Sequence, residues 1–276
     1  MDVPPVQHQR VWLIGGTSDS ARLARALLAR SVPFVVTVTT SSAQALYPVG
    51  TAVQVGRLDC SLMASFIAQW AVRCVLDASH PFAVEVSKQA IALCQQRAIS
   101  YLRYERSALS SSALSASAIA SSEPFSDDAL IEEVDSIEAL VKSDILQGQR
   151  VLFTLGYRTL DRFAALRASA QLFARVLPSA EAIDGALQAG FSAREIIALR
   201  PPISTVLEAA LWQHWGITCV VAKASGQPGG EDTKRQLAKQ LGVRLVLIQR
   251  PQLKYPAQTN VVKSAVDFCV KTLSLY

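Results

Sequence analysis

The chain has 276 residues, of which 50% are hydrophobic and 18% are charged, and its formal net charge is +5. This length is typical of about two domains, and the apolar content excludes a largely disordered chain. The mild positive charge favours an anionic small molecule over nucleic acid because Lys and Arg form no cluster, and no apolar run reaches the ~20 residues of a membrane-spanning helix.

The N-terminal segment lacks the basic stretch followed by an apolar core that marks a signal peptide. We therefore expect a cytoplasmic protein that does not bind a membrane. The five cysteines are scattered and form no CxxC motif. Their spacing argues against a disulfide framework and against a zinc site, and it favours reduced, mostly structural thiols.

In the first half of the chain, strand-like and helix-like segments alternate. Residues 11–14 predict a strand, residues 15–18 a turn, and residues 19–30 an amphipathic helix in which Leu23 and Leu27 share a face. The alternation continues with strands at 34–39, 52–55, 74–78 and 101–104 and with helices at 62–72 and 82–97. Strands separated by single helices indicate right-handed crossovers within a parallel sheet.

The composition changes after the last of these strands. Residues 107–122 hold eight serines, five alanines, two leucines and one isoleucine, and they carry no charge. This composition favours a flexible linker or a surface loop, and a lid over a site is the alternative. We therefore expect an N-terminal domain at 1–106, a Ser/Ala-rich linker or loop insertion at 107–126 and a C-terminal domain at 127–276.

Beyond the linker the alternation resumes, with strands at 151–155, 172–176, 195–199, 218–222 and 244–249 and helices at 179–188, 204–215, 231–241 and 260–273. The sequence thus predicts an α/β fold made of two doubly wound, Rossmann-like domains with parallel sheets. We expect ligands to bind in a cleft between the domains, at the carboxyl ends of the strands. One alternative stays open, namely that the last helix packs on the first domain.

The first candidate site is the turn between the first predicted strand and helix, which consists of Gly15, Gly16, Thr17, Ser18 and Asp19. Glycines let the backbone approach a ligand, and the start of the helix offers N–H groups to a phosphate, beside two hydroxyl donors. A tight turn capped by Asp19 or Ser18 is the alternative, since the three-glycine dinucleotide fingerprint is absent. Residues 36–42 carry no acidic side chain for a ribose 2′-hydroxyl, which favours NADP(H) over NAD(H) if a nicotinamide binds.

Ser79 and His80 form a second candidate site, between a buried strand and a helix. An imidazole at the carboxyl edge of a sheet can bind a substrate carboxylate or deliver a proton, whereas a helix cap beside a surface histidine is the alternative. Arginines also follow several predicted strands and together favour a carboxylate-binding rim, although a solvated surface arginine is the alternative for each. These arginines are Arg57, Arg103, Arg106 and Arg250.

A third candidate lies between a strand and a helix in the second half of the chain, and it combines Lys223, Ser225, Gly226, Gly230 and Lys234. Backbone N–H groups, a hydroxyl and two cationic side chains can together bind an anion. The segment lacks the spacing of a P-loop, and a long flexible loop is the alternative.

Taken together, these motifs resemble the precorrin-6A reductase (cobalt-precorrin-6A reductase) family of cobalamin biosynthesis. The matching elements follow one another along nearly the whole chain: GGT-x-[ED] at 15–19, GRLD at 56–59, DA[ST]HP[FY]A at 77–83, LR-x-ER at 102–106, K-x-SG at 223–226 and RP at 250–251. Three elements depart from the family pattern, because Ser107 replaces a proline, Ala224 replaces an aspartate, and PPIS at 201–204 replaces GPFS.

The resemblance implies an NADPH-dependent oxidoreductase that reduces one double bond of precorrin-6A or cobalt-precorrin-6A by hydride transfer and protonation, without a metal. It implies that the turn at 15–19 and the loop at 223–234 bind NADPH or substrate anions, and that His80 and Arg57 contact the substrate. Carboxylates of the substrate would be bound by Ser79, Arg103, Arg106 and Arg250. The implied partners are a small-molecule tetrapyrrole and neighbouring enzymes of the pathway, and protonation by solvent instead of His80 stays open.

Other functions are weighed against this one. A short-chain dehydrogenase pairs a tyrosine with a lysine four residues on, and none of the six tyrosines has one. A non-catalytic NADP(H)-binding sensor module remains the main alternative, and an interaction protein that uses the Ser/Ala segment is a weaker one. Oxidation of NADPH that depends on substrate distinguishes an enzyme from a sensor.

Overall fold

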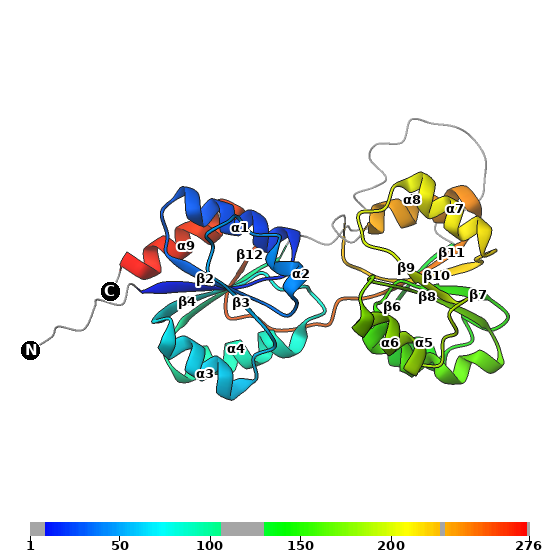
Figure 1. Ribbon diagram of the computed structural model, residues 1–276, viewed down its shortest axis with the longest axis horizontal. Coiled ribbons are helices and arrows are strands. Elements are labelled where there is room, and N and C mark those ends of the chain that lie inside the picture. The colour runs from blue at the N-terminus through cyan, green and yellow to red at the C-terminus, as the bar shows by residue number, and fades with distance from the viewer. Residues whose placement is uncertain (1–8, 106–129, 227–229, 275–276) are drawn as a thin grey trace, which may run out of the picture. The chain divides into compact units, whose positions relative to one another are not determined.

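The computed structural model describes residues 9–105, 130–226 and 230–274, and these form two compact units (Figure 1). Unit 1 comprises Met1–Ser107 and Gln252–Tyr276, and unit 2 comprises Ala108–Pro251. Within the described residues, each unit contains a six-stranded parallel sheet with helices on both faces. The predicted α/β fold with two doubly wound domains is thereby confirmed.

In unit 1 the sheet has the strand order β12-β5-β4-β1-β2-β3, with every neighbouring pair parallel. Its strands are β1 (Arg10–Ile14), β2 (Phe34–Val38), β3 (Val53–Val55), β4 (Val72–Asp77), β5 (Ser100–Tyr104) and β12 (Gln258–Thr259). Its helices are α1 (Ser18–Ala29), α2 (Ser41–Gln44), α3 (Cys60–Gln69), α4 (Val84–Gln96) and α9 (Val262–Ser274).

The side chains of β1 show how the two faces of this sheet are covered. Successive residues of a strand point to opposite faces, so an apolar run without alternation requires a helix layer on each side. Val11 and Leu13 join the core cluster beneath α1 and α9, whereas Trp12 and Ile14 join the cluster beneath α3 and α4. Figure 1 shows these helix pairs on opposite sides of the sheet.

In unit 2 the strand order is β6-β11-β10-β7-β8-β9, again with every pair parallel. Its strands are β6 (Ile131–Val134), β7 (Arg150–Phe153), β8 (Gln171–Val176), β9 (Ile196–Ala198), β10 (Cys219–Lys223) and β11 (Arg244–Ile248). Its helices are α5 (Ile137–Lys142), the 3-10 helix η2 (Tyr157–Ala168), α6 (Ala180–Gln188), α7 (Thr205–His214) and α8 (Glu231–Leu241). Helices α7 and α8 cover one face, whereas α5 and α6 lie on the other (Figure 1).

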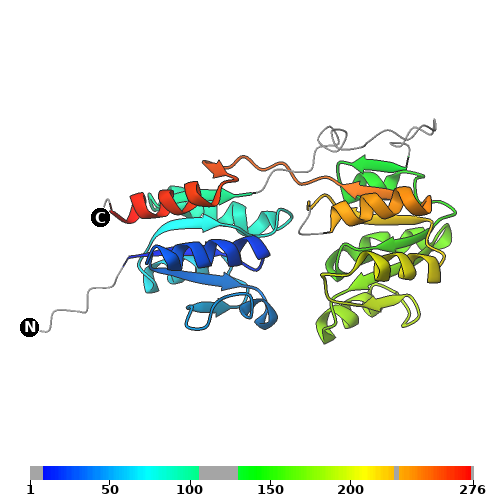
Figure 2. The same ribbon diagram turned by 90° about the horizontal axis from the view of Figure 1, so that it is seen from above.

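Both sheets follow the doubly wound order 3-2-1-4-5-6. The sixth strand of each sheet does not directly follow the fifth along the chain: it is β12 in unit 1 and β6 in unit 2. After β5 the chain leaves unit 1 and forms β6 at the edge of the other sheet. After β11 it returns to unit 1 and forms β12 beside β5, where Arg103 N–H donates to the Ala257 carbonyl at 2.9 Å and Glu105 N–H donates to the Thr259 carbonyl at 3.0 Å. Figure 2 shows this orange segment passing back to unit 1, where it continues into the red helix α9.

The predicted C-terminal domain at 127–276 is therefore wrong for its last 25 residues, since Gln252–Tyr276 belong to unit 1. The alternative that the last helix packs on the first domain is the one observed. Ala265, Val266 and Cys269 of α9 are buried in the same core cluster as Val11 and Leu13 of β1. This face of the sheet would expose buried apolar side chains beside α1 if α9 packed elsewhere.

Several predicted segments lie outside the described residues, among them the Ser/Ala segment at 107–122, the rest of the linker to 126, and Arg106. The predicted strands and helices are observed within a few residues of their expected bounds. Five further elements were not predicted: α2, β6, α5, β12 and the 3-10 helix η2. In the described part of the chain, no helix combines the length and the apolar character needed to cross a membrane.

Candidate active site

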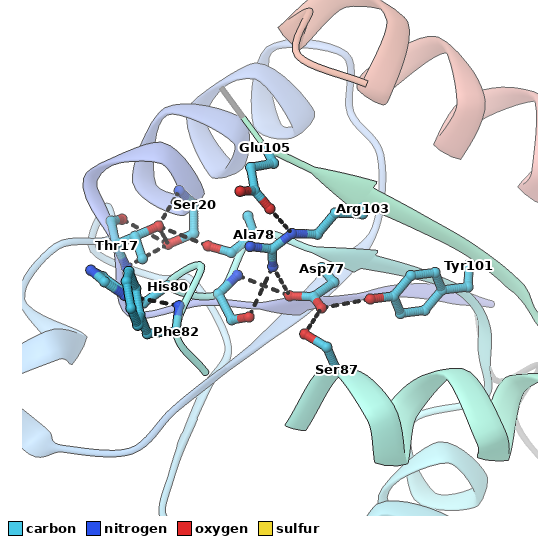
Figure 3. Close-up of polar contacts among 11 residues, drawn as sticks. Thr17, Ser20, Asp77, Ala78, His80, Phe82, Ser87, Tyr101, Arg103 and Glu105 are labelled. Carbon is cyan, nitrogen blue, oxygen red and sulfur yellow. Dashed lines mark hydrogen bonds and ion pairs between the residues drawn. The ribbon is translucent and has the colours of Figure 1, made fainter. Parts of the chain in front are cut away.

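In unit 1 the strand order reverses between β1 and β4, because β2 and β3 follow on one side of this pair and β5 and β12 on the other. Ligands of doubly wound folds bind at such a switch point, outside the carboxyl ends of the strands. The turn after β1 and the loop after β4 meet there, and Figure 3 shows their side chains. Two candidate sites from different parts of the sequence are thus brought to one edge.

The turn after β1 requires both of its glycines, for different reasons. A Cβ on Gly15 would overlap the Tyr47 hydroxyl and lie 2.8 Å from Val36 Cγ1, so only glycine fits against these side chains. Gly16 has a φ of +95°, which side-chain-bearing residues rarely adopt, and a Cβ there would meet nothing within 4 Å. Its N–H donates to the Tyr47 hydroxyl at 2.8 Å. Tyr47 therefore holds the turn through this hydrogen bond, while the space next to the Gly16 Cα is open.

Thr17 ties this turn to the loop after β4. Its hydroxyl accepts a hydrogen bond from Ser20 N–H at 3.0 Å, as the N-cap of α1, and donates to the Ala78 carbonyl at 2.8 Å (Figure 3). The Thr17 hydroxyl, which was predicted to bind a ligand, thus forms hydrogen bonds within the protein. Ser18, the first residue of α1, is exposed, so the positive end of the helix dipole is accessible at this edge. Asp19 lies in the same turn and pairs with Arg22 at 3.4 Å.

Asp77, the last residue of β4, is completely buried and accepts four hydrogen bonds (Figure 3). The donors are Ser79 N–H at 2.9 Å, the Ser87 hydroxyl at 2.6 Å, the Tyr101 hydroxyl at 2.6 Å and the Arg103 guanidinium at 2.9 Å. Burial, together with the charge of Asp77, raises the pKa of Tyr101 far above its usual range, so its hydroxyl remains a donor. These bonds fix the start of the loop that carries His80.

Arg103 occupies a different place from the predicted carboxylate-binding rim. Its side chain is 1% exposed and faces Asp77 from the neighbouring strand β5. Besides Asp77, its guanidinium donates to the Ser79 hydroxyl at 3.0 Å and to Glu105 at 3.0 Å, and it lies over the Tyr255 ring. Arg103 is thus buried beside the charge of Asp77, and the buried Ser79 hydroxyl takes part in the same network.

His80 follows this network and is exposed at the carboxyl edge of the sheet. Its Nδ1 accepts a hydrogen bond from Phe82 N–H at 3.3 Å, and the two rings lie 5.8 Å apart (Figure 3). A neutral imidazole whose Nδ1 is an acceptor carries its proton on Nε2. The structure therefore gives His80 a donor nitrogen at the switch point, directly after the buried hydrogen-bond network of Asp77 and Arg103.

Arg57 is not brought together with His80. It follows β3 and is exposed, and the N–H of the preceding Gly56 donates to the Val38 carbonyl at the end of β2, at 2.9 Å. In the sheet order, β3 lies three strands from β4, which corresponds to roughly 14 Å at the usual strand spacing. The sheet order thus sets Arg57 apart from His80, and the expectation that both are catalytic residues in contact with the substrate stays a prediction.

Unit 2 has its own switch point, between β7 and β10. Lys223 ends β10 and is half-buried, and burial together with the nearby Arg158 lowers its pKa. The Ser225 hydroxyl donates to the Lys223 carbonyl at 3.2 Å, and Gly226 N–H donates to the Glu231 carboxylate at 2.7 Å. The Gly226 N–H, which was predicted to bind an anion, is therefore already bound to the Glu231 carboxylate.

The loop after β7 in unit 2 was not among the predicted sites. Gly156 has a φ of +82° there and precedes η2, and Arg158 lies in the first turn of that 3-10 helix. A glycine directly after the predicted strand at 151–155 was the signal that could have identified this loop. Because η2 is not an α-helix, the position equivalent to the start of α1 offers no full α-helix dipole.

Lys234 and Arg250 both contact the backbone of the loop after β10. Lys234 is 5% exposed, and its Nζ donates to the Gly230 carbonyl at 3.1 Å, while burial and the charge of Arg175 lower its pKa to about 8. Arg250 Nε donates to the Ala224 carbonyl at 2.7 Å. Both residues were predicted to bind ligands, and the structure shows each of them in contact with the backbone of the loop itself.

Replacing Lys234 with methionine is expected to stabilise unit 2 at pH 7 and to flatten its stability between pH 8 and 10.5. Burial lowers the pKa of Lys234 from its ordinary 10.5 to about 8, so in this window the unfolded chain binds more protons and wild-type stability rises with pH. Below pH 8 Lys234 is protonated in both the folded and the unfolded chain, and the cost of burying its charge is fully present, on the order of 1–3 kcal/mol. Urea-dependent hydrogen exchange of β10 and β11 amides at pH 7, 8.5 and 10 measures it.

The exposed Lys239 on the same helix provides the control, and its replacement by methionine is expected to change stability by less than about 0.5 kcal/mol. A Lys234→Met profile parallel to that of the wild type across the window would contradict the burial argument.

Comparison with known proteins assigns the family. The family model described as "Precorrin-6x reductase CbiJ/CobK" matches residues 10–270. A cobalt-precorrin-6A reductase of Synechocystis sp. is 40% identical over 95% of this chain and 97% of its own length, and one of Priestia megaterium is 32% identical over 94% and 98%. A solved structure of CobK precorrin-6A reductase has the same fold, with a TM-score of 0.73 at 21% identity over 96% of this chain and 97% of its own. The chain belongs to the precorrin-6x reductase CbiJ/CobK family.

Proposed function

We propose that this protein reduces one double bond of the precorrin-6A or cobalt-precorrin-6A macrocycle with NADPH, as a step of cobalamin biosynthesis. The observation that carries the proposal is the 40% identity to a cobalt-precorrin-6A reductase across nearly the full length of both chains. The open, glycine-lined switch point of unit 1 supports it, because such an edge suits a dinucleotide.

Unit 1 is the better candidate for the cofactor domain. Its turn after β1 combines the open Gly16 with the exposed start of a twelve-residue α-helix, which together can bind a pyrophosphate. In unit 2 the equivalent turn leads into a 3-10 helix, and Glu231 already occupies the Gly226 N–H in the loop after β10. A phosphate bound at the loop after β10 would therefore lie beside the Glu231 carboxylate.

The residues of unit 1 then bind and orient rather than react. NADPH supplies the hydride when it is bound. The turn from Gly15 to Ser18 holds the pyrophosphate, and the Asp77–Arg103 network fixes the loop of His80 beside the switch point. His80 Nε2 can donate a hydrogen bond to the macrocycle. To deliver a proton to the carbon next to the one reduced, the ring must first become an imidazolium, with Nδ1 taking up a proton from solvent in place of the Phe82 N–H bond.

We infer that the basic edge of unit 2 can bind an anionic group. Burial and, after it, the charge of Arg158 lower the pKa of Lys223, so the two cations lie near one another there. An anion bound to both would relieve their repulsion.

The proposal is tested by mixing the purified protein with NADPH and each macrocycle, with and without cobalt, and following nicotinamide absorbance with the macrocycle spectrum. We expect NADPH to be oxidised only when macrocycle is present, in a one-to-one ratio. His80→Ala is expected to lower kcat by about 100-fold, the lower range for a general acid, with a smaller change in KM. NADPH binding without turnover of either macrocycle would instead indicate a sensor module.

The His80 assignment has its own contradicting result within this assay. Full turnover by His80→Ala would mean that solvent supplies the proton. His80→Gln separates the two roles of the ring, because an amide still donates a hydrogen bond and cannot deliver a proton.

A further inference from the structure

We propose that Arg57, together with the hydroxyls of residues 39–42 after β2, binds the 2′-phosphate of NADPH and so selects it over NADH. This inference rests on the proposed function, in that unit 1 holds the dinucleotide. It changes the role of Arg57 from the substrate contact that the family resemblance implies to a determinant of cofactor choice.

The position of Arg57 in the fold is the first argument. In a doubly wound dinucleotide fold, the adenosine ribose lies near the carboxyl end of the second strand. The bond from Gly56 N–H to the Val38 carbonyl fixes the end of β3 against the end of β2. Figure 1 shows α2 starting beside these two strand ends. Arg57 therefore emerges next to the place where the ribose belongs.

The charge of the segment that follows β2 also favours a 2′-phosphate. An NAD-binding fold has an acidic side chain at the end of the second strand, which accepts a hydrogen bond from the 2′-hydroxyl and repels a 2′-phosphate. No Asp or Glu occurs between Asp19 and Asp59 in this chain. The Asp59 carboxylate accepts the Leu62 N–H at 2.8 Å as the N-cap of α3. Arginine is thus the first charged residue that follows β2.

The neighbouring side chains provide the third argument. Residues 39, 41 and 42 are exposed hydroxyl-bearing residues, and Thr40 Oγ1 lies 3.2 Å from Ser42 Oγ. Neither hydroxyl is used as a cap for α2. A phosphate has several acceptor oxygens, so it can take a forked pair of bonds from a guanidinium and further bonds from such hydroxyls.

Distance argues against the other role for Arg57. The switch point at β1 and β4, where the nicotinamide and macrocycle must meet near His80, lies two to three strands away. That is roughly 10–14 Å along the sheet edge, which is similar to the distance between the two ends of a bound dinucleotide rather than to a contact distance. Arg57 and His80 thus mark opposite ends of the same ligand.

The test uses two nucleotides that differ only in the 2′-phosphate, adenosine 2′,5′-bisphosphate and adenosine 5′-monophosphate, with binding measured by calorimetry. We expect the wild type to bind the bisphosphate more tightly. Arg57→Ala is expected to weaken bisphosphate binding by roughly tenfold to a hundredfold, the value of one charge-assisted contact, and to leave the monophosphate unchanged. Arg57→Lys, which keeps the charge without the fork, is expected to lie between them.

The control is Arg97→Ala, since Arg97 is an exposed arginine of unit 1 that precedes β5 and so lies at the opposite edge of the sheet. It should bind both nucleotides like the wild type. A preference for the bisphosphate that Arg57→Ala leaves intact, or an equal loss for both nucleotides, would overturn the role of Arg57 alone. Failure of the wild type to bind NADPH or either nucleotide would instead overturn the proposed function.

Discussion

Replacing Arg103 with methionine is expected to lower the free energy of unfolding of unit 1 by roughly 3–5 kcal/mol, the range for breaking a buried ion pair on one side. Asp77 is completely buried, and Arg103 is its cationic partner at 2.9 Å. The substitution would leave the carboxylate with hydroxyl and N–H donors but without a countercharge. Urea-dependent hydrogen exchange of the β4 and β5 amides measures the effect within unit 1.

Two further variants test the reason for this loss. An Asp77→Leu/Arg103→Met double variant is expected to lose less than the sum of the two single losses, because it removes both buried charges. Lys88 and Glu85 form an exposed pair at 3.8 Å, and Lys88→Met should change stability by less than about 1 kcal/mol. A loss below about 1 kcal/mol in Arg103→Met would show that the pair does not support the loop.

Gly15→Ala is expected to have the second-largest effect, with a destabilisation of unit 1 on the order of 1–3 kcal/mol and weaker binding of adenosine nucleotides. The added Cβ would overlap the Tyr47 hydroxyl, so either Tyr47 or the turn must move. Because Tyr47 also accepts the Gly16 N–H, either movement displaces the turn that binds phosphate. Hydrogen exchange and nucleotide calorimetry measure the two effects.

A double variant identifies the clash as the cause. Adding Tyr47→Phe to Gly15→Ala removes the atom that overlaps most, so part of the lost stability should return. Gly50→Ala is the matched control, because Gly50 has a φ of +86° and open space around it. It should cost only backbone strain, about 1 kcal/mol, and leave nucleotide binding unchanged. If Gly15→Ala behaved like Gly50→Ala, the packing argument for this glycine would be wrong.

Hydrophobic periodicity was enough to predict most of the fold, since the strands around β1 and β10 are apolar runs that must be covered on both faces. It could not predict the exchanged sixth strands. β12 has two residues and β6 reads IEEV, so neither carries a strand pattern, and each forms only because a distant strand offers an open edge. The cleft expected between the two domains stays a prediction.

The candidate site was predictable in its location but not in the role of each side chain. The turn after β1 and the loop after β4 were recognised because glycines and a histidine follow apolar strands. That Arg103 is buried depends on the register that sets it opposite Asp77 on the neighbouring strand, a pairing that no local pattern encodes. Likewise, the distance between Arg57 and His80 follows from the strand order rather than from their spacing in the chain.

A crystal structure of the protein with bound NADP⁺ tests the central claim most directly, namely that unit 1 is the cofactor domain. We predict density for the pyrophosphate against Gly16 and Ser18 at the start of α1, and density for the 2′-phosphate beside Arg57. A dinucleotide bound instead at the edge of unit 2, against Gly156 and Lys223, would contradict the assignment.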